Sequence, residues 1–238
     1  MRRLRGGAAA AMVLVCAVAG CKAGTKTGSG GPQETGGGGA ALTAAESLTV
    51  KGRAPKTGYS RDRFGAAWAD TDSNSCDTRD DVLKRDLDEV KFSDGKCKVS
   101  YGVLESDPYS GQKVTYRRGR SLVDIDHMVA LSDAWQKGAK YWDARKRIAL
   151  ANDPLNLLAV DASINRAKGD GDTATWVPPN KAYRCTYVAA QVAVKKKYGL
   201  WVTAAEKAAM EKVLRTCPGQ KLPSGGNPTE APARFRAG

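Results

Sequence analysis

The stretch Val123-Asp124-Ile125-Asp126-His127 contains the single histidine of the 238-residue chain. Apolar and acidic residues alternate along it, which is the period-2 pattern of a half-buried strand. Asp124 and Asp126 should therefore share one face of that strand, and His127 should stand where it ends. A carboxylate beside an imidazole can combine a metal ligand with a general base, but the same pair can also be a polar strand end. The flanking sequence has to decide between these two interpretations.

Two segments further along the chain extend this strand into a strand–strand–helix pattern. Residues 155–160 form a short, nearly continuous apolar run that is interrupted by Asn156, and we expect a buried strand there. Asp161 can cap a short helix over Ala162–Lys168, which a glycine ends. This helix carries Asn165, nine positions after Asn156.

Helices and a β-hairpin are expected on both sides of this pattern. Residues 77–90 show helical periodicity with acidic residues in the first turn, which suits the helix dipole. Cys97–Leu104 and Gln112–Tyr116 should be two strands, joined by a turn that contains Pro108 and Gly111. Further helices are expected over residues 41–48, 128–138 and 141–151, and a C-terminal helical hairpin over residues 185–217.

The cysteines predict two disulfides. Cys185 begins the first helix of the C-terminal hairpin and Cys217 ends the second, so antiparallel packing brings them together. By elimination, Cys76 pairs with Cys97. Such a set suits a chain that folds outside the cytoplasm.

The N-terminus has the pattern of an export signal. A basic start and a short apolar run occupy residues 1–21. Val18-Ala19-Gly20-Cys21 resembles a lipobox, in which Cys21 is lipidated and anchors the protein to the outer face of the cell membrane. Alternatively, Ala17-Val18-Ala19 is a cleavage site for a soluble secreted protein. Lipidation of Cys21 leaves an even number of cysteines and is the preferred interpretation.

Composition divides the rest of the chain into three parts. Residues 22–40 are rich in Gly, Thr and Ser and predict a flexible linker. Residues 41–217 form the expected domain, and the Pro- and Gly-rich residues 218–238 are expected to be disordered. No apolar run after the export signal is long enough to span a bilayer.

The formal net charge of +13 favours polyanionic partners such as nucleic acid, anionic wall polymers or lipid headgroups, although it also serves solubility. One histidine excludes zinc sites that need two or more. The chain contains no Gly-x-Ser-x-Gly motif and no phosphate-binding Gly-Lys-Ser/Thr motif. A Ser–His–Asp hydrolase remains formally possible, but no serine is marked as its nucleophile.

Three segments together resemble the HNH, or ββα-metal, nuclease motif: residues 123–127, 152–160 and 165–170. The run from Tyr101 to Cys217 looks most like the actinobacterial HNH endonuclease family proteins, which are related to the C-terminal domain of GmrSD-type restriction enzymes. The resemblance extends more loosely back to Tyr59. It implies an α+β fold with a ββα-metal core at residues 121–170, an additional β-hairpin and flanking helices. Asn165 stands where the motif name places its final histidine.

The chemistry of these residues is consistent with the resemblance. Neutral His127, with an ordinary pKa of about 6.5, can take a proton from water. Asp126 and Asn165 offer hard oxygen ligands for Mg²⁺, with Mn²⁺ as an alternative, and Asp124 is the alternate ligand. The resemblance assigns Asn156 to bracing the loop that orients the histidine. Lys168 is expected to contact phosphate.

The expected function is therefore an exported, metal-dependent endonuclease that cuts DNA with little sequence specificity. RNA is a further possible substrate. Basic residues near the site are the candidates for substrate binding: Arg118, Arg120 and Arg166. The alternative is a non-catalytic surface lipoprotein that binds DNA or anionic wall polymer through an HNH-like fold.

Overall fold

The computed structural model describes residues 39–237. The expected export signal, the lipidation candidate Cys21 and almost all of the expected linker lie outside the described residues. Within them, none of the helices has both the length and the apolar character needed to cross a membrane.

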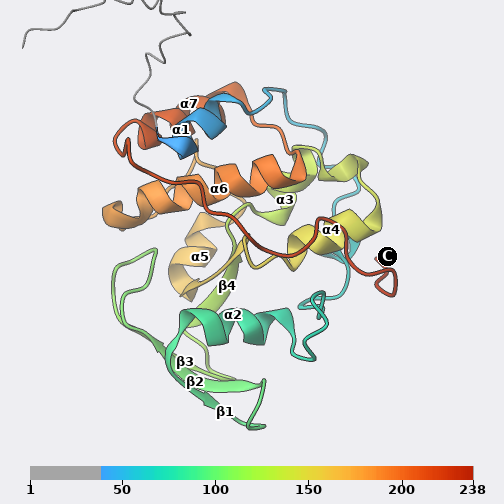
Figure 1. Cartoon of the computed structure of the whole chain (residues 1–238), viewed down its shortest axis with the longest axis vertical. Coiled ribbons are helices and arrows are strands. Elements are labelled where there is room, and N and C mark those ends of the chain that lie inside the picture. Colours follow the sequence, from blue (N-terminus) through green and yellow to red (C-terminus); the bar gives the residue numbers. More distant parts are fainter. Residues whose placement is uncertain (1–38, 238) are drawn as a thin grey trace, which may run out of the picture. The chain divides into compact units, whose positions relative to one another are not determined.

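The chain alternates helices with short strands, giving a mixed α+β architecture (Figure 1). The helices are α1 (Ala40–Glu46), α2 (Thr78–Asp86), α3 (Leu131–Gln136), α4 (Ala144–Ala151), α5 (Ala162–Lys168), α6 (Arg184–Tyr198) and α7 (Ala204–Leu214). The strands are β1 (Asp88–Phe92), β2 (Val99–Leu104), β3 (Val114–Arg117), β4 (Val123–His127) and β5 (Leu157–Asp161).

Strands β4 and β5 form an antiparallel pair that runs directly into α5. The register pairs Val123 with Asp161 at one end and His127 with Leu157 at the other. The Asp161 side chain accepts hydrogen bonds from the backbone N–H groups of Ser163 and Ile164, so the last residue of β5 caps α5. The strand–strand–helix order predicted from sequence is present. Asn156 lies just before β5 rather than within it.

The other sheet has three antiparallel strands in the order β1-β2-β3, where the sequence predicted a hairpin of two. The predicted helix over residues 77–90 ends at Asp86, and Leu87 is already extended. Residues 88–92 pair with β2 instead. Gly102 of β2 makes room for this, because a Cβ there would lie 2.8 Å from the Leu87 side chain. Strand pairing thus overrides a helical pattern.

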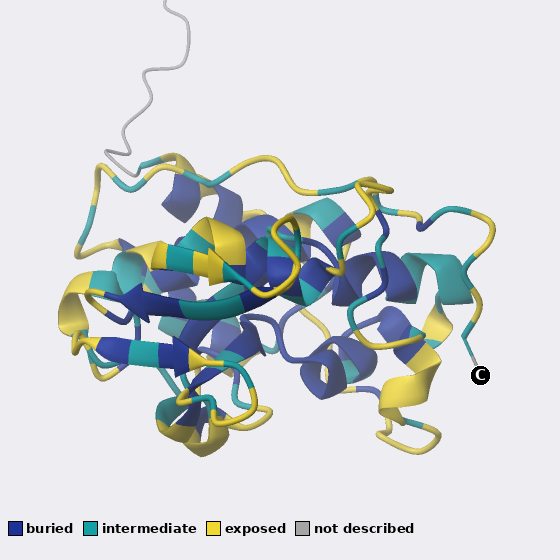
Figure 2. Ribbon diagram, turned by 90° about the horizontal axis from the view of Figure 1, so that it is seen from below, coloured by how far each residue is buried: buried dark blue, intermediate teal, exposed yellow. Residues whose placement is uncertain are grey.

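Helix α6 lies at the centre of the helical part of the fold. Its middle is fully buried, and it packs against both α1 and α7, which lie together on one side of it (Figure 1). At the end of the fold opposite α1 and α7, α2 packs against β2 and β5 (Figure 1). The inner faces of the helices and strands are buried, whereas most connecting loops are exposed (Figure 2). The β4–β5–α5 unit is therefore held between the helical layer and the sheet.

Both predicted disulfides are confirmed. Cys76 and Cys97 join the loop before α2 to the start of β2, with their Cα atoms 5.4 Å apart. Cys185 and Cys217 join the start of α6 to the end of α7, with a Cα–Cα distance of 6.4 Å. Each closes a loop in the unfolded chain and typically contributes about 2–4 kcal/mol to stability.

One lysine near the end of α6 faces the interior of the fold. Lys195 is completely buried and forms ion pairs with Asp133 and Glu206. Lys137 joins the same two carboxylates, at 2.6 Å from each. This buried cluster ties α3, α6 and α7 together. The sequence could not show it, because its carboxylates come from distant segments.

The segment after Cys217 corrects the expectation of disorder for residues 218–237. It has no regular secondary structure, but it returns across α4 and the end of α6 (Figure 1). Ala231 is buried, and its N–H donates to the Arg145 carbonyl at 3.1 Å. The N–H of Asn227 donates to Asp153 at 3.2 Å. The prolines and glycines of this segment prevent regular helix or strand, but the segment still packs against the rest of the fold.

Candidate active site

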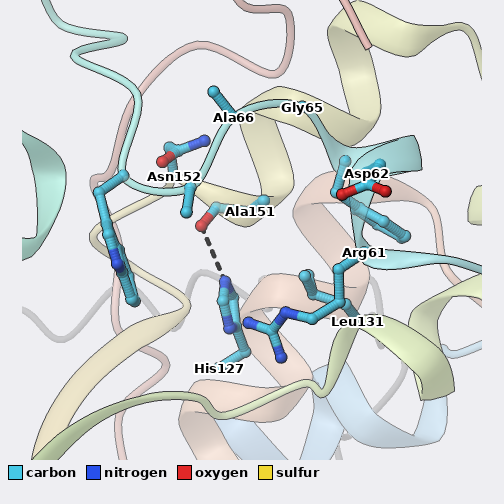
Figure 3. A pocket seen from close by; sticks show the side chains of 11 residues that line it. Arg61, Asp62, Gly65, Ala66, His127, Leu131, Ala151 and Asn152 are labelled. Atoms are coloured by element: carbon cyan, nitrogen blue, oxygen red, sulfur yellow. Dashed lines mark hydrogen bonds between the residues drawn. The ribbon is translucent and has the colours of Figure 1, made fainter. Parts of the chain in front are cut away.

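His127 ends β4 with its imidazole almost completely buried, at 8% exposure. Its Nε2 atom lies 2.8 Å from the Ala151 carbonyl oxygen at the end of α4 (Figure 3). Because a carbonyl can only accept, Nε2 carries the proton and Nδ1 keeps the lone pair. Burial lowers the pKa of His127 from 6.5 to about 4. The imidazole is therefore neutral at pH 7 and has a free nitrogen that can accept a proton.

Two cavities meet at His127. The first, about 210 Å³, is polar and is lined by Asp126, Asn165 and Asp170. The second, about 260 Å³, is mainly apolar, and its walls include Phe64 and Trp68. His127, Arg61 and Leu131 line both. The imidazole of His127 therefore contacts whatever occupies either cavity.

Asp126 is buried and is held from two sides. The hydroxyl of Tyr109 donates to one carboxylate oxygen at 2.5 Å, and Lys168 Nζ lies 2.9 Å from the other. Burial and the Asp126 charge raise the pKa of Tyr109 well above its usual range, so the hydroxyl keeps its proton. Asp107 fixes the turn that carries Tyr109, since it accepts from the N–H groups of Tyr109 and Ser110.

The structure corrects the expected contact of Lys168 with phosphate. The Lys168 side chain has no exposed surface, and its ammonium group binds Asp126 and the His127 carbonyl oxygen, the latter at 3.0 Å. Lys168 is one helical turn after Asn165, as the sequence indicated, but it points into the protein. Its contacts are those of a residue that positions the end of β4 rather than one that touches a substrate.

Asn156 is fully buried beside the loop that follows His127. Its side-chain oxygen accepts from the Val129 N–H at 2.8 Å, and its amide nitrogen donates to the Val129 carbonyl at 3.2 Å. Its own carbonyl accepts from the Met128 N–H at 2.8 Å. Three hydrogen bonds thus fasten the two residues after the histidine, which are the contacts that the expected bracing role requires.

Asn165 projects from α5 toward β4. Its amide nitrogen lies 3.3 Å from an Asp124 carboxylate oxygen, which leaves the side-chain oxygen of Asn165 to the polar cavity. Asp124 does not line that cavity and is only partly buried; Arg166 lies 3.8 Å from it. The two aspartates of β4 therefore differ in setting, and Asp126 is the one that reaches the cavity.

The residues around the polar cavity fit a divalent ion that needs few protein ligands. Among the described residues, no group of three or more His, Cys, Asp and Glu side chains is placed to hold a metal. Mg²⁺ is commonly held by one or two oxygen donors and keeps several waters. Asp126 and Asn165 supply two such donors, since each carboxylate oxygen of Asp126 accepts one contact and retains another lone pair. The positive charge of the Lys168 ammonium group, which lies beside Asp126, lowers the affinity of these two donors for any cation.

The arginines predicted to bind substrate differ in their surroundings. Arg118 is committed to the three-stranded sheet, where it donates to the Val99 carbonyl and pairs with Asp80, so its expected role is corrected. Arg120 is exposed in the turn before β4 and lines neither cavity at His127. Arg166, with 72% of its side chain exposed, stands next to Asn165 on α5.

Sequence reasoning missed Arg61 and Trp68. Arg61 points toward the His127 ring (Figure 3). The Trp68 indole stacks on that imidazole, with ring centroids 6.1 Å apart and planes 12° apart. The sequence of this segment does not show locally that it passes the end of β4. The one available signal was an arginine-rich turn before a tryptophan.

Comparison with known proteins identifies the family of this chain. A profile of the family described as "GmrSD restriction endonucleases, C-terminal domain" matches residues 77–213. The chain belongs to this family. The resemblance found in the sequence is thereby confirmed, and membership supports a nuclease-type function. The matched residues contain β4, β5 and α5, whereas Arg61 and Trp68 precede them.

A curated relative from Arthroderma benhamiae carries the name "Uncharacterized secreted protein". It is 45% identical over 172 residues, which cover 71% of this chain and 81% of the relative. No solved structure matches the chain significantly.

Proposed function

We propose that this chain is an exported, metal-dependent HNH endonuclease that hydrolyses phosphodiester bonds in DNA with little sequence specificity. β4, β5 and α5 are its ββα-metal core. The observation that carries the proposal is a neutral, hydrogen-bonded His127 beside a polar cavity that Asp126 and Asn165 also line. Family membership supports the reaction class.

His127 acts as the general base. Its Nδ1 accepts a proton from water while Nε2–H remains bound to the Ala151 carbonyl, which holds the ring in one tautomer. The bonds from Asn156 to Val129 and Met128 keep the chain after His127 from shifting the ring. The water that loses its proton attacks phosphorus, and the bond from phosphorus to the 3′ oxygen breaks.

Asp126 and Asn165 would hold the divalent ion, Mg²⁺ or Mn²⁺. When bound, such an ion supplies neutralisation of charge on the scissile phosphate and on the departing oxygen. Tyr109 and Lys168 fix the direction in which the Asp126 carboxylate faces. Lys168 therefore serves as a positioning residue.

The basic surface supplies binding that does not depend on sequence. Arg61 lines the cavities at His127, and Arg166 is exposed beside Asn165, so both can meet phosphates on either side of the cut. The formal net charge of +13, which becomes +10 when Arg2, Arg3 and Arg5 are removed with the export signal, favours a polyanion, and binding should weaken steeply with salt. Nothing in these contacts recognises the 2′ position, so RNA remains an alternative substrate.

The proposal of export rests on the N-terminal pattern, on the two disulfides and on the name of the secreted relative. Lipidation at Cys21 remains the preferred form, with cleavage after Ala19 as the alternative. Mass spectrometry of the mature N-terminus distinguishes them, because a diacylglyceryl cysteine has a different mass from a free Gly20 terminus.

Digestion of plasmid DNA, single-stranded DNA and RNA with Mg²⁺ or Mn²⁺ tests the activity. The wild type should cut at least one of them, EDTA should stop the cutting, and His127→Ala should cut about 10²–10⁴-fold more slowly. Tyr141→Ala, at an exposed aromatic away from the site, is the matched control. The non-catalytic lipoprotein would instead bind DNA in EDTA and with His127→Ala, and would cut nothing with any divalent ion.

A further inference from the structure

We propose that the apolar cavity beside His127 receives one unstacked nucleobase of the substrate, so that this enzyme cuts next to an unpaired nucleotide. This inference rests on the proposed function and deepens it by naming the substrate class. It is carried by the walls of the cavity, by an unpartnered polar atom of a residue in those walls and by the backbone that places Trp68.

The walls of the cavity suit a flat aromatic ring. Phe64, Trp68 and Leu131 line about 260 Å³ of space, and His127 forms part of the same lining. Pockets that take a nucleobase out of a stack hold it between aromatic and apolar side chains. Each base stacked on an aromatic side chain is held in a sequence-tolerant way, because every base has a π-face.

Asn152 places one hydrogen-bond acceptor in this apolar setting. It is 1% exposed and lines the cavity (Figure 3). Its amide nitrogen donates to the Ile148 carbonyl at 3.0 Å, which fixes the orientation of the amide. Its side-chain oxygen then has no hydrogen-bond partner among the described residues. Buried acceptors are rarely left unpaired, so an exocyclic amino group or ring N–H of a base that reaches this oxygen would give it the missing partner.

The segment before α2 is bent so that it delivers Trp68 to the histidine. Trp68 has φ of +59°, which is unusual for a bulky residue, and Gly65 has φ of +80°. A Cβ at Gly65 would lie 2.6 Å from the Ile148 side chain, so only glycine allows this close approach to α4. Thr78 of α2 then anchors the end of the loop, with bonds to the Trp68 and Ala69 carbonyls. The two residues with positive φ, Gly65 and Trp68, thus lie where the segment brings the indole against His127.

The relation between the two cavities completes the argument. Asp126 and Asn165 line only the polar cavity, Asn152 and Trp68 line only the apolar one, and His127 stands between them. A nucleotide whose phosphate lies on the polar side can therefore place its base on the apolar side. A base paired within a duplex cannot enter, so an unpaired or easily unpaired nucleotide is preferred.

The test uses duplex oligonucleotides with a single bulged adenosine at successive positions, and the same duplexes with an abasic residue in its place. At one position relative to the cut, we expect wild-type kcat/KM to be roughly tenfold higher with the base than without it. Trp68→Ala should reduce this ratio to about one, and Trp68→Phe should retain most of it. A bulged purine nucleoside that lacks the amino group of adenine should be cut more slowly than adenosine, and Asn152→Ala should remove that difference.

The ratio is informative because loss of overall activity affects both substrates equally. Tyr141→Ala should keep the wild-type ratio, and thermal unfolding curves identify any variant that fails to fold. Fluorescence anisotropy with the same oligonucleotides in EDTA measures the ratio of affinities without turnover. Absence of cutting together with a Trp68-dependent preference for the base would refute the nuclease and keep the pocket. Equal cutting and equal binding of base and abasic substrates at every position would overturn the inference.

Discussion

The Tyr109 hydroxyl donates a hydrogen bond to the Asp126 carboxylate at 2.5 Å, although 17 residues separate the two in sequence. The contact joins the turn between β2 and β3 to the end of β4. Asp107 anchors that turn to the β5–α5 junction as well, because it accepts from the Asp161 N–H at 2.7 Å. The turn between β2 and β3 thus fixes the orientation of Asp126, which we propose as a metal ligand.

Removal of this hydroxyl should weaken metal binding. Tyr109→Phe keeps the packed ring but leaves one Asp126 oxygen without its donor, and losses of such outer contacts commonly cost about 10–100-fold in metal affinity or activity. Titration of Mn²⁺ by isothermal calorimetry, together with the Mn²⁺ dependence of cleavage, measures the effect. Tyr116→Phe, at a buried tyrosine of β3, is the control. An unchanged Mn²⁺ affinity in Tyr109→Phe would remove the positioning role of Tyr109.

The two proposed metal ligands should be separable from the base. Asp126→Ala and Asn165→Ala should both raise the Mn²⁺ concentration needed for half-maximal cleavage as well as lower the rate, whereas His127→Ala should lower the rate without weakening Mn²⁺ binding. Asp124→Ala should have a smaller effect than either, since Asp124 does not line the polar cavity and contacts the proposed ligands only through the Asn165 amide nitrogen, at 3.3 Å. If Asp124→Ala proves more damaging to Mn²⁺ affinity than Asp126→Ala, the ligand assignment is reversed.

Stability should decrease on acidification because of His127. Its folded-state pKa is about 4, against about 6.5 in the unfolded chain, so the unfolded state binds more protons below pH 7. The stabilisation is complete above pH 6.5 and is lost progressively as pH falls toward 4. Between pH 7 and pH 5 the expected loss is about 2 kcal/mol. Urea unfolding in EDTA should show this loss for the wild type, relative to His127→Gln. Parallel pH curves for the two proteins would contradict it.

The buried ion pairs of α3, α6 and α7 should matter for stability. Lys195→Met would leave Asp133 and Glu206 with less compensation in the interior, and breaking such a buried pair costs about 3–5 kcal/mol. Lys196→Met, at the exposed neighbour, should change stability little. Urea midpoints compare the two variants. Equal midpoints would mean that the ion pairs of Lys195 contribute no net stability.

Local sequence signals were enough to predict the strand–strand–helix unit. The alternation in β4, the Asp161 cap and the glycine after Lys168 each act within a few residues, and the structure has all three. Strand β1 was missed because its residues also fit a helix, and only pairing with β2 selects the extended form. Tertiary contacts decide such cases.

The same limit applies to the site. Adjacency predicted that Asp126 and His127 act together, and spacing predicted that Asn165 approaches them. Burial of Lys168 depends on Asp126, which is 42 residues away in sequence, and Arg61 and Trp68 reach His127 from a segment that precedes α2. A lysine one turn after a candidate ligand looks the same in sequence whether it faces solvent or the interior. Contacts of this kind become visible only in three dimensions.

The most direct test of the central claim is single-turnover cleavage of one DNA substrate by the wild type and His127→Ala in saturating Mg²⁺ or Mn²⁺. Loss of a general base typically costs about 10²–10⁴-fold in rate. We therefore expect His127→Ala to be slower by that factor, with DNA binding in EDTA unchanged. Equal rates for the two proteins would contradict the account, because no other described residue offers an imidazole beside the polar cavity.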